Sequence, residues 1–455
     1  MKTIRAAAAL LLCLLLSLSL AAPALAAGPA PCGLRVLVDG RETTVRAYSE
    51  SYEGNLYLSL SDLSRALDGT SKRFRAVYES SAGDGELWRV TTGQSAAPET
   101  KGAAATGSGA AVSLALQRNR LFVDGGERRY YSYRADDKEL YLSLADVQLM
   151  LDLTALPLED GGLRLLPEQP FAPDLDELRA EGYFTAFNAV LVGDLDTGEI
   201  LFSGNRTRPY PIASLSKLMT YWLLAEAVEA GAASWSDAVT VSARAAALSR
   251  TADGIVKLDE GQVVSLRELT GCMLLASSNE CALAAAEYLA GSEERFVELM
   301  NESARELGLR SARFYTVHGL PSYSRSGLPA KRQNGMSATD LFRLSALLLR
   351  RWPDVTEITS RQFMRFDQLQ YTTANSNPLV FNLPGVTGLK TGSTNRAGYC
   401  LVATLPVTAG GETHTLAAVV LGAESADLRG QCAEILLRAA RDHYEAEGFA
   451  QADLP

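Results

Sequence analysis

Three short motifs follow one another along the chain, and together they carry the residue types of a serine acyl-transfer enzyme. They are Ser-Leu-Ser-Lys at 214–217, Ser-Ser-Asn at 277–279 and Lys-Thr-Gly at 390–392. This set supplies a hydroxyl nucleophile, an amine base, a second hydroxyl that can relay a proton, and a cation that can hold a carboxylate. Each motif alone occurs easily by chance, so the prediction depends on their order and their local context.

Ser214 opens an apolar stretch, 215–230, which has the composition of a helix. A hydroxyl at a helix N-terminus lies where the helix dipole favours developing negative charge. Lys217 follows one turn later on the same face, so its amine can reach the hydroxyl of Ser214. If burial and a nearby cation lower its pKa, the neutral amine can act as general base. An N-cap serine beside a surface lysine is the simpler alternative.

The second motif interrupts an apolar, alanine-rich stretch, 272–290, that otherwise has the composition of a helix. Small polar residues inside such a stretch are costly unless they face a site or are fully hydrogen-bonded. We expect Ser277 to carry a proton between the lysine and a leaving amine. We expect Asn279 to bind a substrate amide and to position Lys217. An internal turn between two helices would explain the same interruption.

The third motif is typical of an edge strand. Lys390 offers a cation to a substrate carboxylate, the hydroxyl of Thr391 adds a hydrogen bond, and Gly392 lets a peptide backbone approach closely. An extended substrate can then pair with this strand. The backbone N–H groups of Ser214 and Ser393 are candidates for an oxyanion hole.

The elements that must hold these motifs are strands at both ends of the region and helices between them. One amphipathic helix is predicted over 425–445, after the last strand. We therefore expect an α/β (α+β) fold: a five-stranded antiparallel sheet flanked by helices, with an inserted helical subdomain. The motifs would meet where the sheet joins the helical part. The predicted strands are 186–194, 199–203, 389–391, 399–405 and 415–421.

An internal repeat precedes this region. Leu-Val-Asp-Gly at 37–40 recurs as Phe-Val-Asp-Gly at 122–125, and Leu-Tyr-Leu-Ser at 56–59 recurs at 140–143. Each copy predicts strands around an Asp-Gly turn and then a short helix, near 61–67 and 145–151. The predicted domains are stalk-like repeats 33–90 and 112–167, a flexible linker 91–111, and a catalytic domain 174–446.

The two copies resemble copper amine oxidase N-terminal-like domains, which serve as stalk modules of secreted proteins. The segment contains no histidine, so copper has no ligand basis there. We expect a passive spacer, with a wall-binding module as the alternative.

Residues 1–26 have the pattern of a secretory signal peptide, with Lys2 and Arg5 before an apolar run and Ala-Leu-Ala at 24–26. A retained membrane anchor is the alternative. The net charge of −10 argues against binding nucleic acid. Five cysteines follow the signal, an odd number without metal-ligand spacing, so neither a metal nor another cofactor is expected. Cys272 and Cys281 are expected to lie more than two helical turns apart.

Residues 174–446 resemble the D-alanyl-D-alanine carboxypeptidases, the low-molecular-mass penicillin-binding proteins. The resemblance is carried by Pro-Ile-Ala-Ser-Leu-Ser-Lys-Leu-Met-Thr at 211–220, Thr-Val-His-Gly-Leu at 316–320 and Gly-Leu-Lys-Thr-Gly-Ser-Thr at 388–394. It implies the β-lactamase/DD-peptidase fold, a stem-peptide substrate of peptidoglycan that ends in D-Ala-D-Ala, and inhibition by β-lactams. It also implies an acylated Ser214, with Lys217 as base and Ser277 as relay. The implied substrate-binding residues are Asn279, Lys390, Thr391, Gly392, Ser393 and Thr394.

Two departures from the family pattern stand out. Many members carry His where this chain has Ser393, an exchange that a backbone oxyanion contact tolerates. Members often add a β-rich domain and a membrane-anchoring helix at the C-terminus, and 448–455 is too short for either. We therefore expect a secreted, extracytoplasmic protein associated with the cell wall and without a C-terminal membrane anchor.

Three alternatives stay open. A DD-endopeptidase differs only in the leaving group. A class A β-lactamase needs a Glu-x-x-Leu-Asn loop, which we do not find between Asn279 and Lys390. A non-catalytic wall-binding protein would be expected to carry a broken motif, and all three motifs here are intact.

Overall fold

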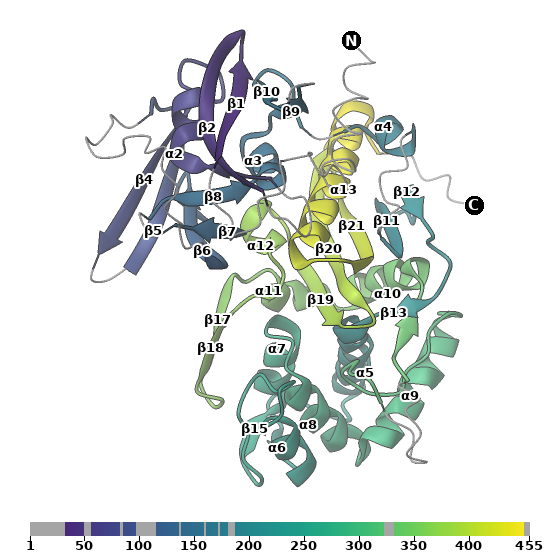
Figure 1. Cartoon of the computed structure of the whole chain (residues 1–455). Coiled ribbons are helices and arrows are strands. Elements are labelled where there is room, and N and C mark those ends of the chain that lie inside the picture. The colour runs from purple at the N-terminus through teal and green to yellow at the C-terminus, as the bar shows by residue number, and fades with distance from the viewer. Residues whose placement is uncertain are drawn as a thin grey trace. The chain divides into compact units, whose positions relative to one another are not determined.

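The structure, a computed structural model, describes residues 32–49, 56–81, 85–96, 115–135, 138–158, 161–171, 173–180, 187–322 and 332–449. They belong to two compact units, Met1–Tyr183 and Phe184–Pro455 (Figure 1). The predicted signal segment, 1–26, lies outside the described residues. Across the described ranges, no helix has both the length and the apolar character needed to cross a bilayer.

The N-terminal unit is built on one ten-stranded sheet. Its strands are β1 (Cys32–Val38), β2 (Arg41–Ser49), β3 (Leu56–Ser59), β4 (Phe74–Ser81), β5 (Gly85–Thr92), β6 (Ala115–Val123), β7 (Gly126–Arg134), β8 (Leu140–Ser143), β9 (Thr154–Pro157) and β10 (Leu163–Leu166). Their order is β4-β5-β6-β7-β8-β3-β2-β1-β10-β9. A short helix, α4 (Leu175–Ala180), follows the sheet in the chain.

The two sequence repeats fold alike within this sheet. In each copy the aspartate of the Asp-Gly turn, Asp39 or Asp124, has a positive φ, as a tight hairpin requires. The helices that follow are α2 (Leu60–Ala66) and α3 (Leu144–Leu151), close to the predicted ranges. Strand β3 pairs with β8, so both copies contribute to one sheet and one core. Most of the linker 91–111 lies outside the described residues.

The C-terminal unit contains the predicted five-stranded sheet. The strands are β11 (Ala189–Asp194), β12 (Ile200–Gly204), β19 (Gly388–Thr394), β20 (Gly398–Ala409) and β21 (Glu412–Ala423). Their order is β12-β11-β21-β20-β19, and every neighbouring pair is antiparallel. The sequence prediction is confirmed here, and the Lys-Thr-Gly motif lies on the edge strand β19.

Helices cover both faces of this sheet. In β21 the alternate residues Ala417, Val419 and Leu421 join the core that the sheet shares with the helical part, including α10 (Ala338–Arg351). Successive strand residues point to opposite faces, and the other face packs against α13 (Ala426–Glu447). Figure 1 shows α13 in front of β20 and β21.

The remaining helices form the inserted subdomain and its connections. Each of α6 to α10 begins after a serine N-cap whose hydroxyl accepts a backbone N–H, which fixes where the helix starts. The short strands pair as β13 with β16, β14 with β15 and β17 with β18. The helices are η1 (Ala213–Ser216), α5 (Lys217–Glu229), α6 (Ala243–Leu248), α7 (Leu266–Leu275), α8 (Asn279–Ala290), α9 (Glu293–Glu306), η2 (Pro353–Val355), α11 (Thr356–Thr359) and α12 (Leu379–Asn382). The strands are β13 (Tyr210–Pro211), β14 (Ala238–Thr240), β15 (Val263–Ser265), β16 (Gly335–Met336), β17 (Phe363–Phe366) and β18 (Tyr371–Ala374).

The expected separation of Cys272 and Cys281 is wrong. The chain turns between α7 and α8, and these two helices pack against each other. The two thiols therefore interact. The pKa of Cys281 is raised mainly by burial and further by the contact with Cys272. Of the five cysteines in the described residues, only Cys32 is exposed.

Candidate active site

Ser214 lies in the 3₁₀ turn η1 that leads directly into α5. The sequence predicted one helix over 215–230, whereas the regular α-helix starts at Lys217. The turn is tight: Ala213 has a φ of 46°, and a Cβ on Gly319 would lie 2.0 Å from the carbonyl oxygen of Ala213. Glycine at 319 is therefore required for the loop 316–320 to pass beside Ser214.

Lys217 is fully buried, and its amine is held by three oxygen atoms. Its Nζ lies 2.8 Å from Ser214 Oγ, 2.7 Å from Asn279 Oδ1 and 3.0 Å from the backbone oxygen of His318. Asn279 Oδ1 and the carbonyl of His318 can only accept hydrogen bonds. A neutral amine gives its two N–H groups to these acceptors and turns its lone pair toward the hydroxyl of Ser214. This is the geometry of a general base.

The electrostatic surroundings of Lys217 favour that neutral form. Burial lowers its pKa to about 7, while the charge of Glu280 acts in the opposite direction. Desolvation disfavours the charged form of any amine in this way. Near neutral pH a large fraction of the molecules therefore carries a base beside Ser214.

The second motif forms the turn between α7 and α8. Asn279 is the first residue of α8, and its Nδ2 donates to the backbone oxygen of Asp253 at 2.8 Å. That bond orients the amide so that Oδ1 faces Lys217. Ser277 has a φ of 68°, an uncommon conformation for a residue with a side chain. Its side chain is half-buried, and within the described part of the chain no hydrogen bond of its hydroxyl is found.

The third motif lies on β19, against the turn that carries Ser214. A Cβ on Gly392 would lie 2.9 Å from both the Ile212 oxygen and the Ser214 nitrogen. Only glycine therefore lets the edge strand approach Ser214 this closely. Ser393, the next residue, is exposed near the end of β19.

Lys390 and Thr391 occupy the start of the same strand. Lys390 is 1 % exposed and donates to the Thr391 oxygen at 3.1 Å. Burial lowers its pKa well below the ordinary value, and the charges of Lys217 and Arg429 act in the same direction. The hydroxyl of Thr391 donates to Ser376 Oγ at 2.8 Å. A substrate carboxylate at this point would raise the pKa of Lys390 again.

A cavity of about 2180 Å³ opens at the end of β19. Ser393, Thr394, Asp253 and His318 are among its lining residues. Thr394 Oγ1 also lies 3.3 Å from Gln333 Oε1, which ties the strand end to the segment behind it. The residues of the three motifs do not line this cavity themselves, and it adjoins them through Ser393, Asp253 and His318, which are their neighbours in the chain or in the fold.

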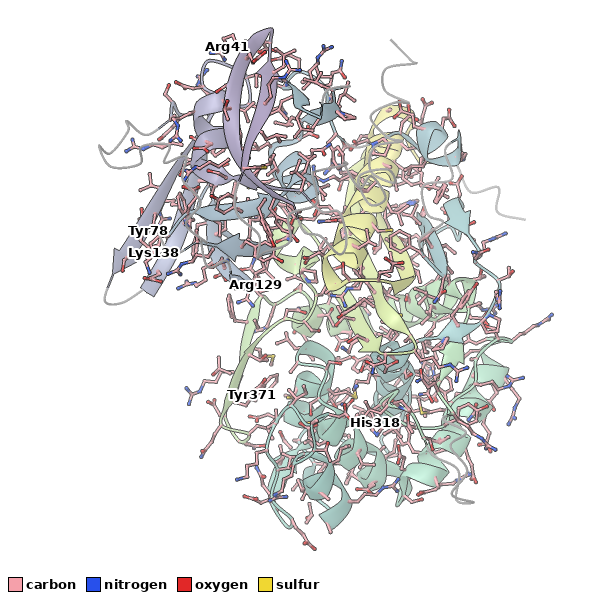
Figure 2. All side chains as sticks on the ribbon, viewed as in Figure 1. Arg41, Tyr78, Arg129, Lys138, His318 and Tyr371 are labelled. Atoms are coloured by element: carbon pink, nitrogen blue, oxygen red, sulfur yellow. The ribbon has the colours of Figure 1, made fainter. Side chains whose placement is uncertain are left out.

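The imidazole of His318 is not set up as a general base. Figure 2 marks His318 among the side chains of the helical part. Its Nδ1 accepts the N–H of Leu320 at 3.1 Å, and burial lowers its pKa to about 3. His318 contributes to the site through its backbone oxygen, which accepts a hydrogen bond from Lys217. Among the described residues, no group of three or more His, Cys, Asp or Glu side chains is arranged to hold a metal ion.

Sequence reasoning missed the backbone oxygens of Asp253 and His318 and the hydroxyl of Ser376. No sequence pattern points to the backbone oxygen of Asp253, because a backbone acceptor has no residue signature. The Thr-Val-His-Gly-Leu segment includes His318 but does not single out its backbone oxygen. Ser376 lies outside the three motifs and meets Thr391 only through the fold.

Comparison with known proteins identifies a family for this chain. Residues 178–425, more than half of the chain, match the family described as D-alanyl-D-alanine carboxypeptidase. The D-alanyl-D-alanine carboxypeptidase DacD of Escherichia coli is 33% identical over 59% of this chain and 65% of its own length. The carboxypeptidase DacF of Bacillus subtilis is 32% identical over 62% of this chain and 70% of its own length.

A solved structure also resembles this chain. A peptidoglycan synthesis regulatory factor (PBP3) from Streptococcus pneumoniae aligns with a TM-score of 0.51 and 29% identity, over 57% of this chain and 72% of that one. The chain spans between about half and 70% of the length of the curated relatives that it matches. It belongs to the D-alanyl-D-alanine carboxypeptidase family.

Proposed function

We propose that this protein is a serine-type D-Ala-D-Ala carboxypeptidase that removes the terminal D-alanine from peptidoglycan stem peptides. The observation that carries the proposal is the buried amine of Lys217, 2.8 Å from Ser214 Oγ and fixed by Asn279 and the His318 oxygen. Burying an amine in this way costs folding free energy, so Lys217 does not serve to stabilise the fold. It is suited to removing a proton from Ser214.

In the proposed acylation, Ser214 Oγ attacks the carbonyl carbon of the penultimate D-alanine while Lys217 takes its proton. The backbone N–H groups of Ser214 and Ser393 receive the negative charge that develops on the carbonyl oxygen. Ser277 passes the proton held by Lys217 to the nitrogen of the leaving D-alanine, the C–N bond breaks, and Lys217 is neutral again. Water then attacks the ester carbon while Lys217 accepts its proton. Lys217 returns this proton to Ser214 Oγ as the ester C–O bond breaks, and the shortened peptide leaves.

The substrate is held along β19. Lys390 and the hydroxyl of Thr391 mark the place of the terminal carboxylate, and Gly392 leaves room for the peptide backbone. The scissile carbonyl lies at Ser393. The rest of the stem peptide continues past Thr394 into the cavity. Asn279 completes the set by binding a substrate amide.

The setting of this reaction is proposed from the sequence. The signal pattern at 1–26 supports secretion and an extracytoplasmic site of action, close to the cell wall. The two repeats, 33–90 and 112–167, are proposed as stalk-like modules, followed by the catalytic domain 174–446. β-Lactams, which resemble the D-Ala-D-Ala terminus, are proposed as inhibitors that acylate Ser214.

The test is intact-mass measurement after incubation with penicillin, together with product analysis on a D-Ala-D-Ala pentapeptide. The wild type should gain one penicilloyl adduct and release one D-alanine. Ser214→Ala should do neither. Ser216→Ala, which changes a buried serine of the same motif that bonds to the Ala213 oxygen, should keep the adduct.

An adduct that persists in Ser214→Ala would remove Ser214 as nucleophile. Cleavage of a cross-linked peptide in preference to the free terminus would favour an endopeptidase. Rapid release of hydrolysed penicillin would favour a β-lactamase.

A further inference from the structure

Glu280 is a fully buried carboxylate next to the catalytic motifs, and the proposed mechanism gives it no role. Its Oε1 accepts the N–H of Ile255 at 2.9 Å and also the N–H of Val256. Its Oε2 is buried and makes no hydrogen bond within the described residues. A buried carboxylate with one oxygen unsatisfied costs free energy. Its presence therefore calls for a compensating function.

The contacts of Glu280 lead directly to the general base. Glu280 follows Asn279 on α8, and its two backbone donors belong to the segment 253–256. The first residue of that segment, Asp253, accepts the bond that orients Asn279. Asn279 in turn holds Lys217 at 2.7 Å. The carboxylate thus clamps the segment that fixes the amide facing the lysine.

Glu280 is also the acidic side chain that acts on Lys217. The titratable groups that affect or are affected by Lys217 are Glu280 and Cys281 on α8, Lys390 on β19, and His318 on the loop 316–320. Lys390 and His318 cannot supply negative charge, and burial keeps the thiol of Cys281 protonated by raising its pKa. The carboxylate and the amine make no direct ion pair, so the amine stays free to serve Ser214.

We propose that Glu280 is a positioning residue of this active site: its buried carboxylate clamps residues 253–256 beside Asn279 and supplies the fixed negative charge that stabilises protonated Lys217 during acylation. The proposal rests on the proposed role of Lys217 as general base. When Lys217 accepts the proton of Ser214 it becomes a buried cation. A fixed carboxylate nearby lowers the free energy of that cation without solvent reorganisation.

Two opposite effects follow when the charge alone is removed. In Glu280→Gln the remaining amide oxygen can still accept the N–H groups of Ile255 and Val256. Without the carboxylate, the pKa of Lys217 falls further, so the acidic limb of the acylation profile should move to lower pH by about one unit. The plateau at high pH should fall severalfold, because a weaker base accepts the proton less readily. The two profiles should therefore cross.

The experiment measures the second-order rate constant of acylation by a fluorescent penicillin from pH 5 to 9, on the full chain. Glu280→Asp keeps the negative charge, so the acidic limb of its acylation profile should have the same pH midpoint as that of the wild type. Glu287→Gln is the matched control, because Glu287 lies on the same helix and bonds to Ser242 instead. Its profile should coincide with that of the wild type. Circular dichroism and melting curves verify that each variant is folded.

A Glu280→Gln profile with the wild-type midpoint, whatever its height, would overturn the proposal and leave Glu280 as a structural clamp. A second readout uses the wild type and needs no acylation. With carboxyl-labelled glutamate, the Glu280 signal, assigned through Glu280→Asp, should show an inflection at the midpoint of Lys217, near pH 7. A signal without this inflection also overturns the proposal. A wild type that neither binds penicillin nor releases D-alanine would instead refute the proposed function.

Discussion

The pH dependence of acylation tests the central feature of this site, the lowered pKa of Lys217. An ordinary lysine has a pKa of about 10.4, so roughly 0.04 % of it is neutral at pH 7. Burial of Lys217 lowers its pKa to about 7, so half of the molecules carry the free base at that pH. The gain in available base is about a thousandfold, equivalent to about 4 to 5 kcal/mol.

The rate constant for acylation by penicillin should therefore fall about tenfold per pH unit below pH 6 and level off above pH 8. The sign follows from the base role: only the neutral amine accepts a proton, and lower pH removes it. Stopped-flow measurement with a fluorescent penicillin gives the profile. Lys217→Arg should abolish acylation, because arginine stays charged. Lys257→Ala, which removes an exposed lysine, should leave the profile unchanged.

Two results would refute this reasoning. A midpoint near pH 10 would mean that Lys217 titrates as an ordinary lysine and that its burial is irrelevant to the reaction. A rate that does not change between pH 5 and 8 would mean that another group removes the proton from Ser214.

Three further predictions concern other parts of the chain. Gly392→Ala should lower acylation by about 10²- to 10³-fold, because the added Cβ pushes β19 away from Ser214 and displaces an oxyanion donor; a rate within threefold of the wild type would contradict this. Lys390→Ala should lower kcat/KM for a D-Ala-D-Ala acid by roughly 10- to 150-fold, the worth of a charge-assisted hydrogen bond of about 1.5–3 kcal/mol, and much less for the matching C-terminal amide. Equal losses on acid and amide would show that Lys390 does not bind the carboxylate. Removing residues 27–170 should leave hydrolysis of a small D-Ala-D-Ala peptide nearly intact, since every proposed catalytic group lies from Ser214 onward, and a large loss would contradict the spacer prediction.

Much of the fold was predictable because it depends on local patterns. The strands of the C-terminal sheet have continuous apolar runs, and β20 and β21 are joined by an Ala-Gly-Gly turn, so their pairing follows from the sequence. The hairpin turns of the repeats follow from Asp-Gly, which tolerates positive φ. The break at 277–279 was visible as polar residues in an apolar run.

Other features were beyond local patterns. The 3₁₀ geometry at Ser214 depends on the loop 316–320, which passes beside it and comes from a segment about one hundred residues later. The contact between Cys272 and Cys281 depends on the sharp turn between two helices. Both reflect tertiary packing, which overrides the tendency of an apolar stretch to continue as one helix.

The types of the candidate reactive residues and their order along the chain could be predicted from the sequence alone, because hydroxyl, amine and amide side chains are visible in it directly. The burial of the Lys217 amine beside Ser214 and its lowered pKa, by contrast, come from the tertiary structure. Its pKa depends on burial among α5, α8 and β19, and its lone pair is aimed by the amide of Asn279 and a backbone oxygen of His318. Desolvation and backbone acceptors leave no signature in the sequence, since both arise when segments distant along the chain pack together.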